Sequence, residues 1–304
     1  MRTKLAFRFV LAVVLGMTVL LSSTPARSQS DLENALEQFD IGSVTGYIQP
    51  MADLFGANMN AGFYHSAAIP TAGLTLSIEL IGMGSLVSDD DKTYTANAPA
   101  GFSPATFQTA TIFGENGTTI SHDLDPTIQF SGSDGIIDAS LFPLAVPQLR
   151  VGSIYGTEFT VRLIGTPSFD DDAFPSTTLF GIGARHSVSQ YIPAAPLDIA
   201  VGLFYSSFTV GEIIDFKGLS IGAQASKSFS VLDLYGGLAW EQSTMDLVYT
   251  STVPGVGKVD IELDGDNSFR FTVGAGLSLA VFHIFADANF GSITNFSGGI
   301  GLGF

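Results

Sequence analysis

The chain has 304 residues, a net charge of −17 and no cysteine. This length suits one large domain or two small ones, and the acidic balance makes nucleic acid an implausible partner. The absence of cysteine excludes disulfides, thiol chemistry, cysteine–metal sites and lipid attachment to an N-terminal cysteine. Only 13% of the residues are charged and the mean hydropathy is +0.36, so the composition does not fit an ordinary soluble acidic protein.

Residues 1–28 have the features of a secretory signal peptide. Three basic residues within the first eight positions precede an uncharged apolar run over 9–21, and Ala26 and Ser28 occupy the two positions that a signal peptidase reads. The run is shorter than the roughly 20 residues that span a bilayer, which disfavours the alternative of a membrane anchor. We expect cleavage after Ser28, which leaves 8 basic against 29 acidic residues and a net charge of −21.

The rest of the chain alternates between apolar and polar residues, which predicts β-strands. Several runs reach the about 9–11 residues of a tilted membrane-spanning strand, beyond the about 5–6 of most globular strands. We predict an all-β fold, an antiparallel transmembrane β-barrel of about ten strands with eight to fourteen open. The expected strands are 71–86, 94–113, 148–164, 176–190, 196–208, 215–227, 230–249, 256–281, 283–291 and 294–304.

Segments outside these strands complete the expected organisation. Region 114–147 contains three prolines and could be a strand pair, a periplasmic excursion or a segment folded into the lumen. Residues 29–70 precede the barrel of 71–304, and helical spacing over 32–39 with an apolar stretch over 48–55 favours an N-terminal plug, or alternatively a helix on the periplasmic rim. Short links near 191–196, 228–230 and 282–283 alternate with longer acidic links over 85–105, 165–176 and 250–267, as periplasmic turns and outer loops do.

The last strand ends on an aromatic residue and carries apolar residues on one face. This pattern resembles the C-terminal signal that the barrel-assembly machinery of Gram-negative outer membranes recognises. We therefore expect the mature chain in the bacterial outer membrane, with that machinery and outer-membrane lipids as partners. The residues of the assembly signal are Phe296, Ile300, Leu302 and Phe304.

Two stretches carry a narrower resemblance. Residues 48–67 contain Ile-Gln-Pro-Met, Gly-Ala-Asn-Met-Asn-Ala-Gly and His-Ser-Ala, and residues 142–152 read Phe-Pro-Leu-Ala-Val-Pro-Gln-Leu-Arg-Val-Gly before Tyr-Gly-Thr-Glu-Phe at 155–159. This arrangement is similar to uncharacterised outer-membrane barrels related to the long-chain fatty-acid transporter (FadL) superfamily. The resemblance covers about residues 45–165 by motif and implies an N-terminal hatch and diffusion of apolar substrates. The chain is shorter than the fourteen-stranded members and matches none of their substrate-binding residues.

Charged residues on the predicted inward faces have mixed sign, which argues against a strongly ion-selective porin. Ion pairs that brace the lumen and hold the plug are one interpretation, and pore selectivity is the other. Inward glycines favour a small, filled barrel. The predicted lumen charges are Glu79, Arg150, Glu158, Arg162, Arg185, Asp198, Asp233, Glu241, Arg270 and Asp287.

Metal binding and catalysis have weak candidates. Asp264, Asp266 and Asn267 resemble a fragment of a calcium loop that lacks the distal glutamate, and a solvated, mutually repelling loop is the alternative, as it is for the clusters 89–91 and 170–172. The pair His186 and Ser187 points to opposite faces of a strand, so we expect no enzyme and no cofactor. The favoured function is passive uptake of a small hydrophobic molecule. The alternatives are a non-transporting structural or assembly-partner barrel and, less favoured, a barrel-embedded lipid hydrolase.

Overall fold

The computed structural model describes residues 41–166, 176–211, 213–250 and 258–303. The predicted signal peptide, the helix expected over 32–39, the acidic cluster 170–172 and Phe304 lie outside the described residues. Within these ranges, no helix is both long and apolar enough to cross a bilayer.

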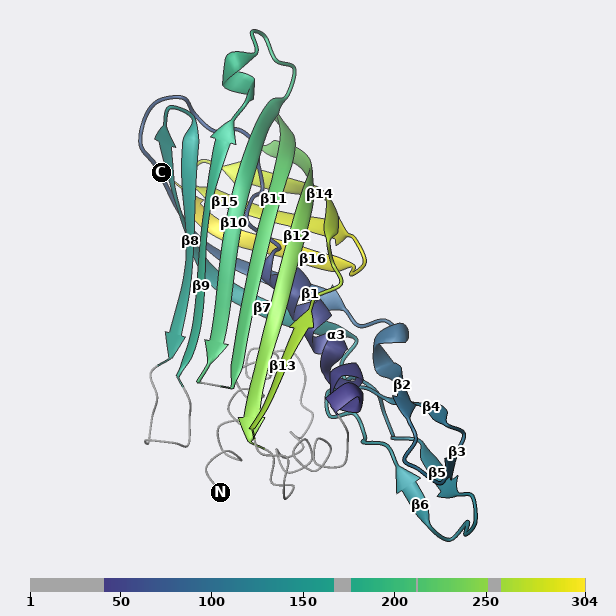
Figure 1. Ribbon diagram of the computed structural model, residues 1–304. Helices are drawn as coiled ribbons and strands as arrows, with labels where there is room; N and C mark the ends of the chain where they lie inside the picture. The colour runs from purple at the N-terminus through teal and green to yellow at the C-terminus, as the bar shows by residue number, and fades with distance from the viewer. Residues whose placement is uncertain (1–40, 167–175, 212, 251–257, 304) are drawn as a thin grey trace.

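Ten antiparallel strands close into a barrel, which confirms the predicted fold class and strand number (Figure 1). Strand β16 pairs with β1 and closes the ring, and β13 and β14 together occupy one position beside β12. The barrel strands are β1 (Thr75–Leu86), β7 (Leu141–Ile154), β8 (Thr157–Thr166), β9 (Thr177–Ser187), β10 (Asp198–Val210), β11 (Ile214–Phe229), β12 (Leu232–Thr250), β13 (Lys258–Asp264), β14 (Phe269–Leu279), β15 (Phe282–Phe290) and β16 (Asn295–Gly303).

Two predicted strands are wrong. Run 94–113 is not in the barrel wall, because Pro99, Gly101 and Pro104 interrupt it; it forms β2 (Thr93–Asn97), β3 (Phe102–Ser103) and β4 (Thr106–Ala110) instead. With β5 (Thr119–His122), β6 (Gln129–Ser131) and a 3-10 helix (Asp90–Lys92), they build an arm that projects beside the barrel (Figure 1). The connection 87–140 is therefore an excursion at the end where β1 finishes.

Run 148–164 contains two strands, β7 and β8, where one was predicted. Tyr155 and Gly156 both have positive φ, 49° and 71°, and make a tight two-residue hairpin turn. A register shift between Val151 and Ile154 keeps the outward apolar residues in phase across the turn. The alternation therefore looked unbroken in the sequence.

The connections differ between the two ends of the barrel. One end has the turns at 155–156, 230–231 and 280–281 and the link 188–197, which includes a 3-10 helix at Ser189–Tyr191. The other end has the long connection 87–140 and those across 167–176 and 251–257, although 211–213 and 291–294 are short there as well.

Helix α3 (Ile41–Met59) and the residues that follow it run lengthwise through the barrel. The helix enters at the end with the long connection, continues through Pro50 and ends at Met59 (Figure 1). The Ser153 hydroxyl, beside the turn at 155–156, donates to the Pro70 carbonyl, so the chain reaches the opposite end before β1 begins. Residues 41–70, named the plug below, thus form the helical plug of the predicted fold.

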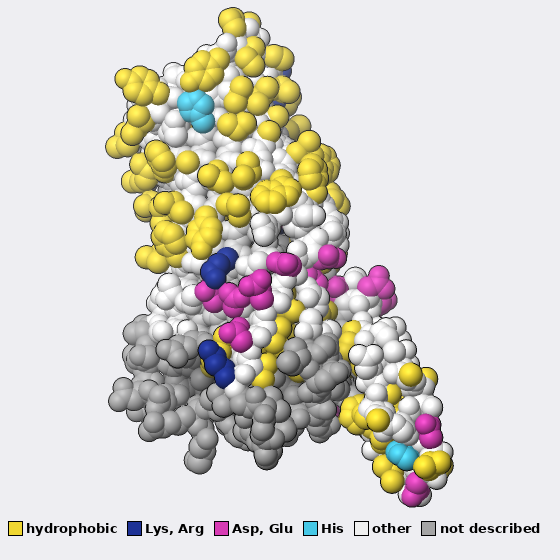
Figure 2. Space-filling model, in the orientation of Figure 1, with side chains coloured by type: hydrophobic (Ala, Val, Ile, Leu, Met, Phe, Trp, Pro, Cys, Tyr) yellow, Lys and Arg dark blue, Asp and Glu magenta, His cyan; other side chains and the backbone are white. Residues whose placement is uncertain are grey.

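The outer surface of the barrel changes polarity along the strands. Apolar side chains cover the part near the short turns, and acidic and basic side chains follow below them (Figure 2). On β12, the outward residues are apolar from Leu232 to Trp240, a stretch that matches the about 9–11 residues of a membrane crossing. Beyond it, β12 and β13 turn Asp246, Asp260 and Glu262 outward. The outer face of the barrel therefore has an apolar belt near the short turns, and the strands project beyond this belt at the other end.

Candidate functional site

The lumen at the level of the apolar belt is lined by charged groups. Nine of the ten predicted lumen charges are buried, and Asp198, at the start of β10 near the short-turn rim, is half-buried. Strand alternation explains this placement, because residues flanking outward apolar side chains face inward. The nine buried charges are Glu79, Arg150, Glu158, Arg162, Arg185, Asp233, Glu241, Arg270 and Asp287.

One ion-pair chain crosses four neighbouring strands. Arg150 on β7 lies 2.8 Å from Glu79 on β1 and 3.4 Å from Glu158 on β8. Glu158 also pairs with Arg185 on β9. Buried ions lose their hydration and are tolerated when they are paired and hydrogen-bonded, so each of these groups depends on its neighbours.

Three arginines bind main-chain carbonyls of the plug. Arg270 Nη2 donates to the Ala57 carbonyl at 2.7 Å, Arg162 Nη2 donates to the Ala61 carbonyl at 2.8 Å, and Arg185 Nη1 donates to the Ser66 carbonyl. The last carbonyls of a helix lack partners within the helix, and cations are favourable at its negative end. Arg270 thus satisfies a carbonyl at the end of α3, and Arg162 and Arg185 hold the plug residues that follow the helix.

Arg162 also packs on an aromatic ring of the plug. Its guanidinium carbon lies 3.6 Å from the centre of the Phe63 ring, and that ring stacks on Phe204 at 4.4 Å. The Arg162 Nε donates to Gln148 Oε1 at 2.8 Å, and the residue is only 1% exposed. A planar guanidinium suits this combined stacking and donation, which a lysine would not reproduce.

A small cavity lined by charged, polar and aromatic side chains lies between the plug and strands β10, β11, β12, β14 and β15. Its volume is about 20 Å³, room for about one water molecule. Glu241 and Arg270 line it and pair at 2.6 Å, and Asp287 and Asn289 face it from β15. Asn267 donates to Glu241 Oε2 at 2.7 Å from the loop before β14.

The weak metal candidates form part of the seat of α3. Asp264 and Asp266 are exposed and Asn267 is buried, so the three point to different surroundings. The Asp264 carbonyl accepts from Gln49, and the Asp266 N–H donates to Asp53 Oδ1 at 2.9 Å. Burial raises the pKa of Asp53 to about 6.

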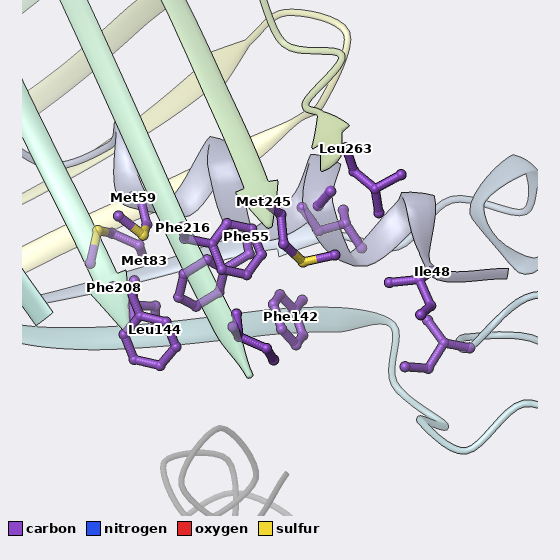
Figure 3. Packing of buried hydrophobic residues seen from close by; sticks show 14 of the residues in the cluster. Ile48, Phe55, Met59, Met83, Phe142, Leu144, Phe208, Phe216, Met245 and Leu263 are labelled. Carbon is purple, nitrogen blue, oxygen red and sulfur yellow. The ribbon is translucent and has the colours of Figure 1, made fainter. Parts of the chain in front are cut away.

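The interior beyond the belt is apolar. Phe55 of α3 packs against Phe208 at 4.9 Å, Phe216 at 4.4 Å and Phe142 at 6.2 Å between ring centres (Figure 3). Inward residues of β12 and β13, such as Met245 and Leu263, extend the same cluster. Helix α3 is therefore surrounded by apolar side chains where the barrel projects from the belt.

A cluster of His65, Glu79 and His283 was not predicted, and it brings together the plug, β1 and β15. In the sequence, histidines stand beside a serine at 65–66 and 186–187, which suggests bases rather than metal ligands. The three residues are far apart in the chain, so only the alternation of β1 and β15 hinted that Glu79 and His283 face inward.

The predicted assembly-signal residues lie on the outer face of β16. Phe296, Ile300 and Leu302 are exposed there, and β16 pairs with β15 and β1. Phe304, the fourth residue of that set, lies outside the described residues.

Comparison with solved structures finds bacterial outer-membrane proteins at low similarity. An outer membrane channel from Pseudomonas putida F1 is 13% identical, with 80% of this chain and 99% of that chain covered and a TM-score of 0.33. OmpF of Salmonella typhi, in complex with daunomycin, is 10% identical over 76% and 97%, with a TM-score of 0.25. The translocator domain of the autotransporter NalP from Neisseria meningitidis is 11% identical over 89% and 99%, with a TM-score of 0.26.

These similarities are too low to carry an argument, so the assignment of the fold rests on the strand pairing and the apolar belt of this chain. No curated protein matches the chain. The model of a family of unknown function, DUF6588, matches residues 1–304, and the chain belongs to that family.

Proposed function

We propose that this protein resides in the bacterial outer membrane and admits small hydrophobic molecules by passive diffusion, with the plug as the gate. The observation that carries the proposal is the apolar interior around α3 at the end with the long connections. Phe55, Phe208 and Phe216 pack against one another there and are buried, so once the plug moves a hydrophobic solute would meet an apolar interior rather than a water-filled pore. Aromatic and aliphatic side chains of this kind line most sites that bind apolar ligands.

A solute in this apolar interior would leave the barrel sideways, between two strands of the wall. At the belt the lumen is polar and filled by the plug, which an apolar solute would not cross readily. At the seam between β1 and β16, Gly82 faces Gly298 and Ile81 faces Gly299, so few side chains brace this part of the wall. A solute leaving there would pass directly into the apolar layer.

The plug is held by contacts that can be exchanged for water. The arginine bonds to Ala57, Ala61 and Ser66 are hydrogen bonds to main-chain carbonyls, and the Ser66 hydroxyl lies 3.3 Å from the Ser226 hydroxyl of β11. Displacement of the plug therefore breaks no covalent link. Opening by a shift of residues 60–70 would connect the apolar interior to the seam.

A disulfide lock tests this function in a chain that has no cysteine of its own. The variant S66C/S226C places two thiols where two hydroxyls now touch. We expect proteoliposomes with the reduced variant to take up a fluorescent fatty-acid analogue, and the oxidised variant to lose most of that uptake. The single variant S66C is the matched control and should respond to neither treatment.

The outcomes separate the alternatives. Equal uptake by oxidised and reduced S66C/S226C would contradict the plug as gate. A complete absence of flux for the unaltered protein, with hydrophobic and hydrophilic solutes alike, would contradict transport and leave the non-transporting barrel. The barrel-assembly machinery and outer-membrane lipids remain the proposed partners, and no enzymatic role is proposed.

The projecting arm favours the non-transporting barrel as a second candidate. It has its own small core of Ala96, Phe107 and Ile120, and Leu124 near its tip is 90% exposed. Residues 112, 113 and 137 pack on α3, but the Gly132 N–H bonds the Thr118 carbonyl farther out, so a short turn can replace residues 119–131, which include Leu124. If the arm is a docking module, this deletion leaves the barrel folded, as heat-dependent gel mobility reports, and abolishes the protein's partner-dependent phenotype in cells. A phenotype that survives the deletion would contradict the docking role.

A further inference from the structure

We propose that His65, Glu79 and His283 form a binding site for a divalent transition-metal ion of the Zn²⁺ class, which ties the plug to the barrel wall. The three residues come from the plug, β1 and β15, and their ligand atoms all lie within 4.8 Å of one another. This inference does not rest on the proposed transport function. It rests on the geometry of the three residues alone, and His65 lies within residues 60–70, which the proposed opening moves.

The distances fit a metal after small adjustments. His65 Nε2 lies 3.1 Å from Glu79 Oε1, and His283 Nε2 lies 3.0 Å from the same oxygen. Bonds of about 2.0–2.2 Å in a tetrahedral site place neighbouring ligand atoms about 3.4 Å apart. Two imidazole nitrogens and one carboxylate oxygen are ligands that zinc commonly takes from proteins, with a fourth position left open.

Gly301 creates the room in which these side chains meet. The strand registers place Gly301 of β16 directly between Glu79 on β1 and His283 on β15. A Cβ atom at Gly301 would lie 2.2 Å from His283 Nε2 and 2.7 Å from Glu79 Cγ. Any other residue there would push the two ligands apart.

Neighbouring side chains orient the Glu79 carboxylate so that one of its oxygens faces the metal position. Glu79 Oε2 accepts from Gln148 Nε2 and Arg150 Nη2, both at 2.8 Å, so Oε1 is left toward the histidines. The Ser77 hydroxyl donates to Oε1 at 2.7 Å and lies 3.3 Å from His283 Nε2. Hydrogen bonds of this kind fix ligand orientation in metal sites.

Packing also pre-organises the two rings. The His65 and His283 rings lie 4.8 Å apart at 31°, and the Phe285 ring lies 4.7 Å from the His65 ring at 30°. The positive charge of Arg150 is shared with Glu158 at 3.4 Å, which reduces its repulsion of a cation at Glu79. An ion here would join the plug to both strands that flank β16.

Metal binding to the purified, metal-stripped full barrel tests the site. We expect isothermal titration with Zn²⁺ to show one ion per chain, and Co²⁺ to give the visible absorption of a tetrahedral centre. The variant H65Q/H283Q removes both imidazoles and keeps hydrogen-bonding side chains near Glu79. Loss of a hydrogen-bond partner behind a metal ligand lowers affinity about 10–100-fold. The affinity of this variant for Zn²⁺ should fall by more than that, because it loses two ligands.

The chain supplies a matched control in its other two histidines. His122 lies on the arm, and His186 on β9 contacts Tyr191 near the short-turn end, away from the cluster. The variant H122Q/H186Q should bind Zn²⁺ as the unaltered protein does, and barrel folding of both variants is checked by heat-dependent gel mobility. Absence of binding to the unaltered barrel, or unchanged binding to H65Q/H283Q, would overturn the proposal.

Discussion

Within one strand, β12, the wall shows two opposite arrangements. Near the short turns it directs Leu238 and Trp240 outward and Tyr235 and Glu241 inward; beyond the belt it directs Asp246 outward and Met245 and Leu247 inward. Where the apolar residues face outward, the polar interior is held by hydrogen bonds and ion pairs. Where polar residues face outward, the interior is a hydrophobic core.

The difference teaches what α3 contributes. A barrel surrounded by an apolar layer needs no hydrophobic core inside, because its apolar surface is already removed from water. A barrel that projects into water gains stability only by burying apolar surface within. Helix α3 supplies that core through Val44, Ile48 and Phe55, and the residues that follow it supply the polar half through main-chain carbonyls.

The largest expected effect comes from Phe55→Ala. The substitution removes the ring that contacts Phe208 and Phe216, and such losses cost about 3–5 kcal/mol. We expect amide hydrogen exchange to accelerate in β13 and in the half of β11 that contains Phe216. The half of β11 near Phe229 should keep its protection. Phe55→Leu should cost less than about 1.5 kcal/mol, and equal exchange in all three proteins would contradict the apolar core.

A smaller effect is expected from Glu241→Gln in the polar half. The amide keeps the shape of the side chain and removes the charge opposite Arg270, which costs about 1.5–3 kcal/mol for a charged hydrogen bond. Fluorescence of Trp240, the one tryptophan of the chain, reports unfolding in urea at this level. Gln242→Ala, next to it on the outer face, should stay within about 0.5 kcal/mol; an equally large loss there would refute the assignment.

Asp53 gives the apolar half a pH dependence. Burial raises the pKa of its carboxyl from 3.8 to about 6 in the folded protein, so protonation stabilises the fold. This contribution is complete below pH 3.8 and is lost as the pH rises through about 6. Because the group is partly exposed, we expect about 1–2 kcal/mol.

The variant Asp53→Asn measures that contribution. The amide oxygen can still accept from the Asp266 N–H, so unfolding curves should show the variant more stable than the unaltered protein at pH 7.5 and equal to it near pH 3.5. Asp264→Asn changes an exposed carboxylate of the same seat and serves as the control. A stability difference for Asp53→Asn that is the same at both pH values would contradict the assignment.

The smallest effect is expected on the outer face beyond the belt. Lys217 pairs with Asp215 at 3.2 Å and Asp246 at 3.1 Å, and all three side chains are substantially exposed. Lys217→Met should lower stability by less than about 1 kcal/mol, and the difference should vanish at high salt because exposed pairs are screened. A larger, salt-independent loss would show that this surface is not water-facing.

Much of the barrel could be predicted from sequence. The alternation in β10, β12 and β15 identified which residues face outward, because a strand between two different environments must match each face to its surroundings. The same reasoning placed Glu158 and Arg162 inward without any knowledge of their partners. It failed over 94–113 and 148–164, where a few turn residues rather than periodicity decide the path of the chain.

By itself the sequence determined the class of fold, the inward charges and the outward apolar face of the last strand, since all three follow from a local period of two. Which inward residues meet depends on how the barrel closes around the plug. His65, Glu79 and His283 converge because the plug runs past β1 and β15 and because Gly301 separates them in the wall. Likewise Phe55 meets Phe216 only because α3 lies in the lumen. Such contacts depend on closure of the barrel around the plug, which no local pattern encodes.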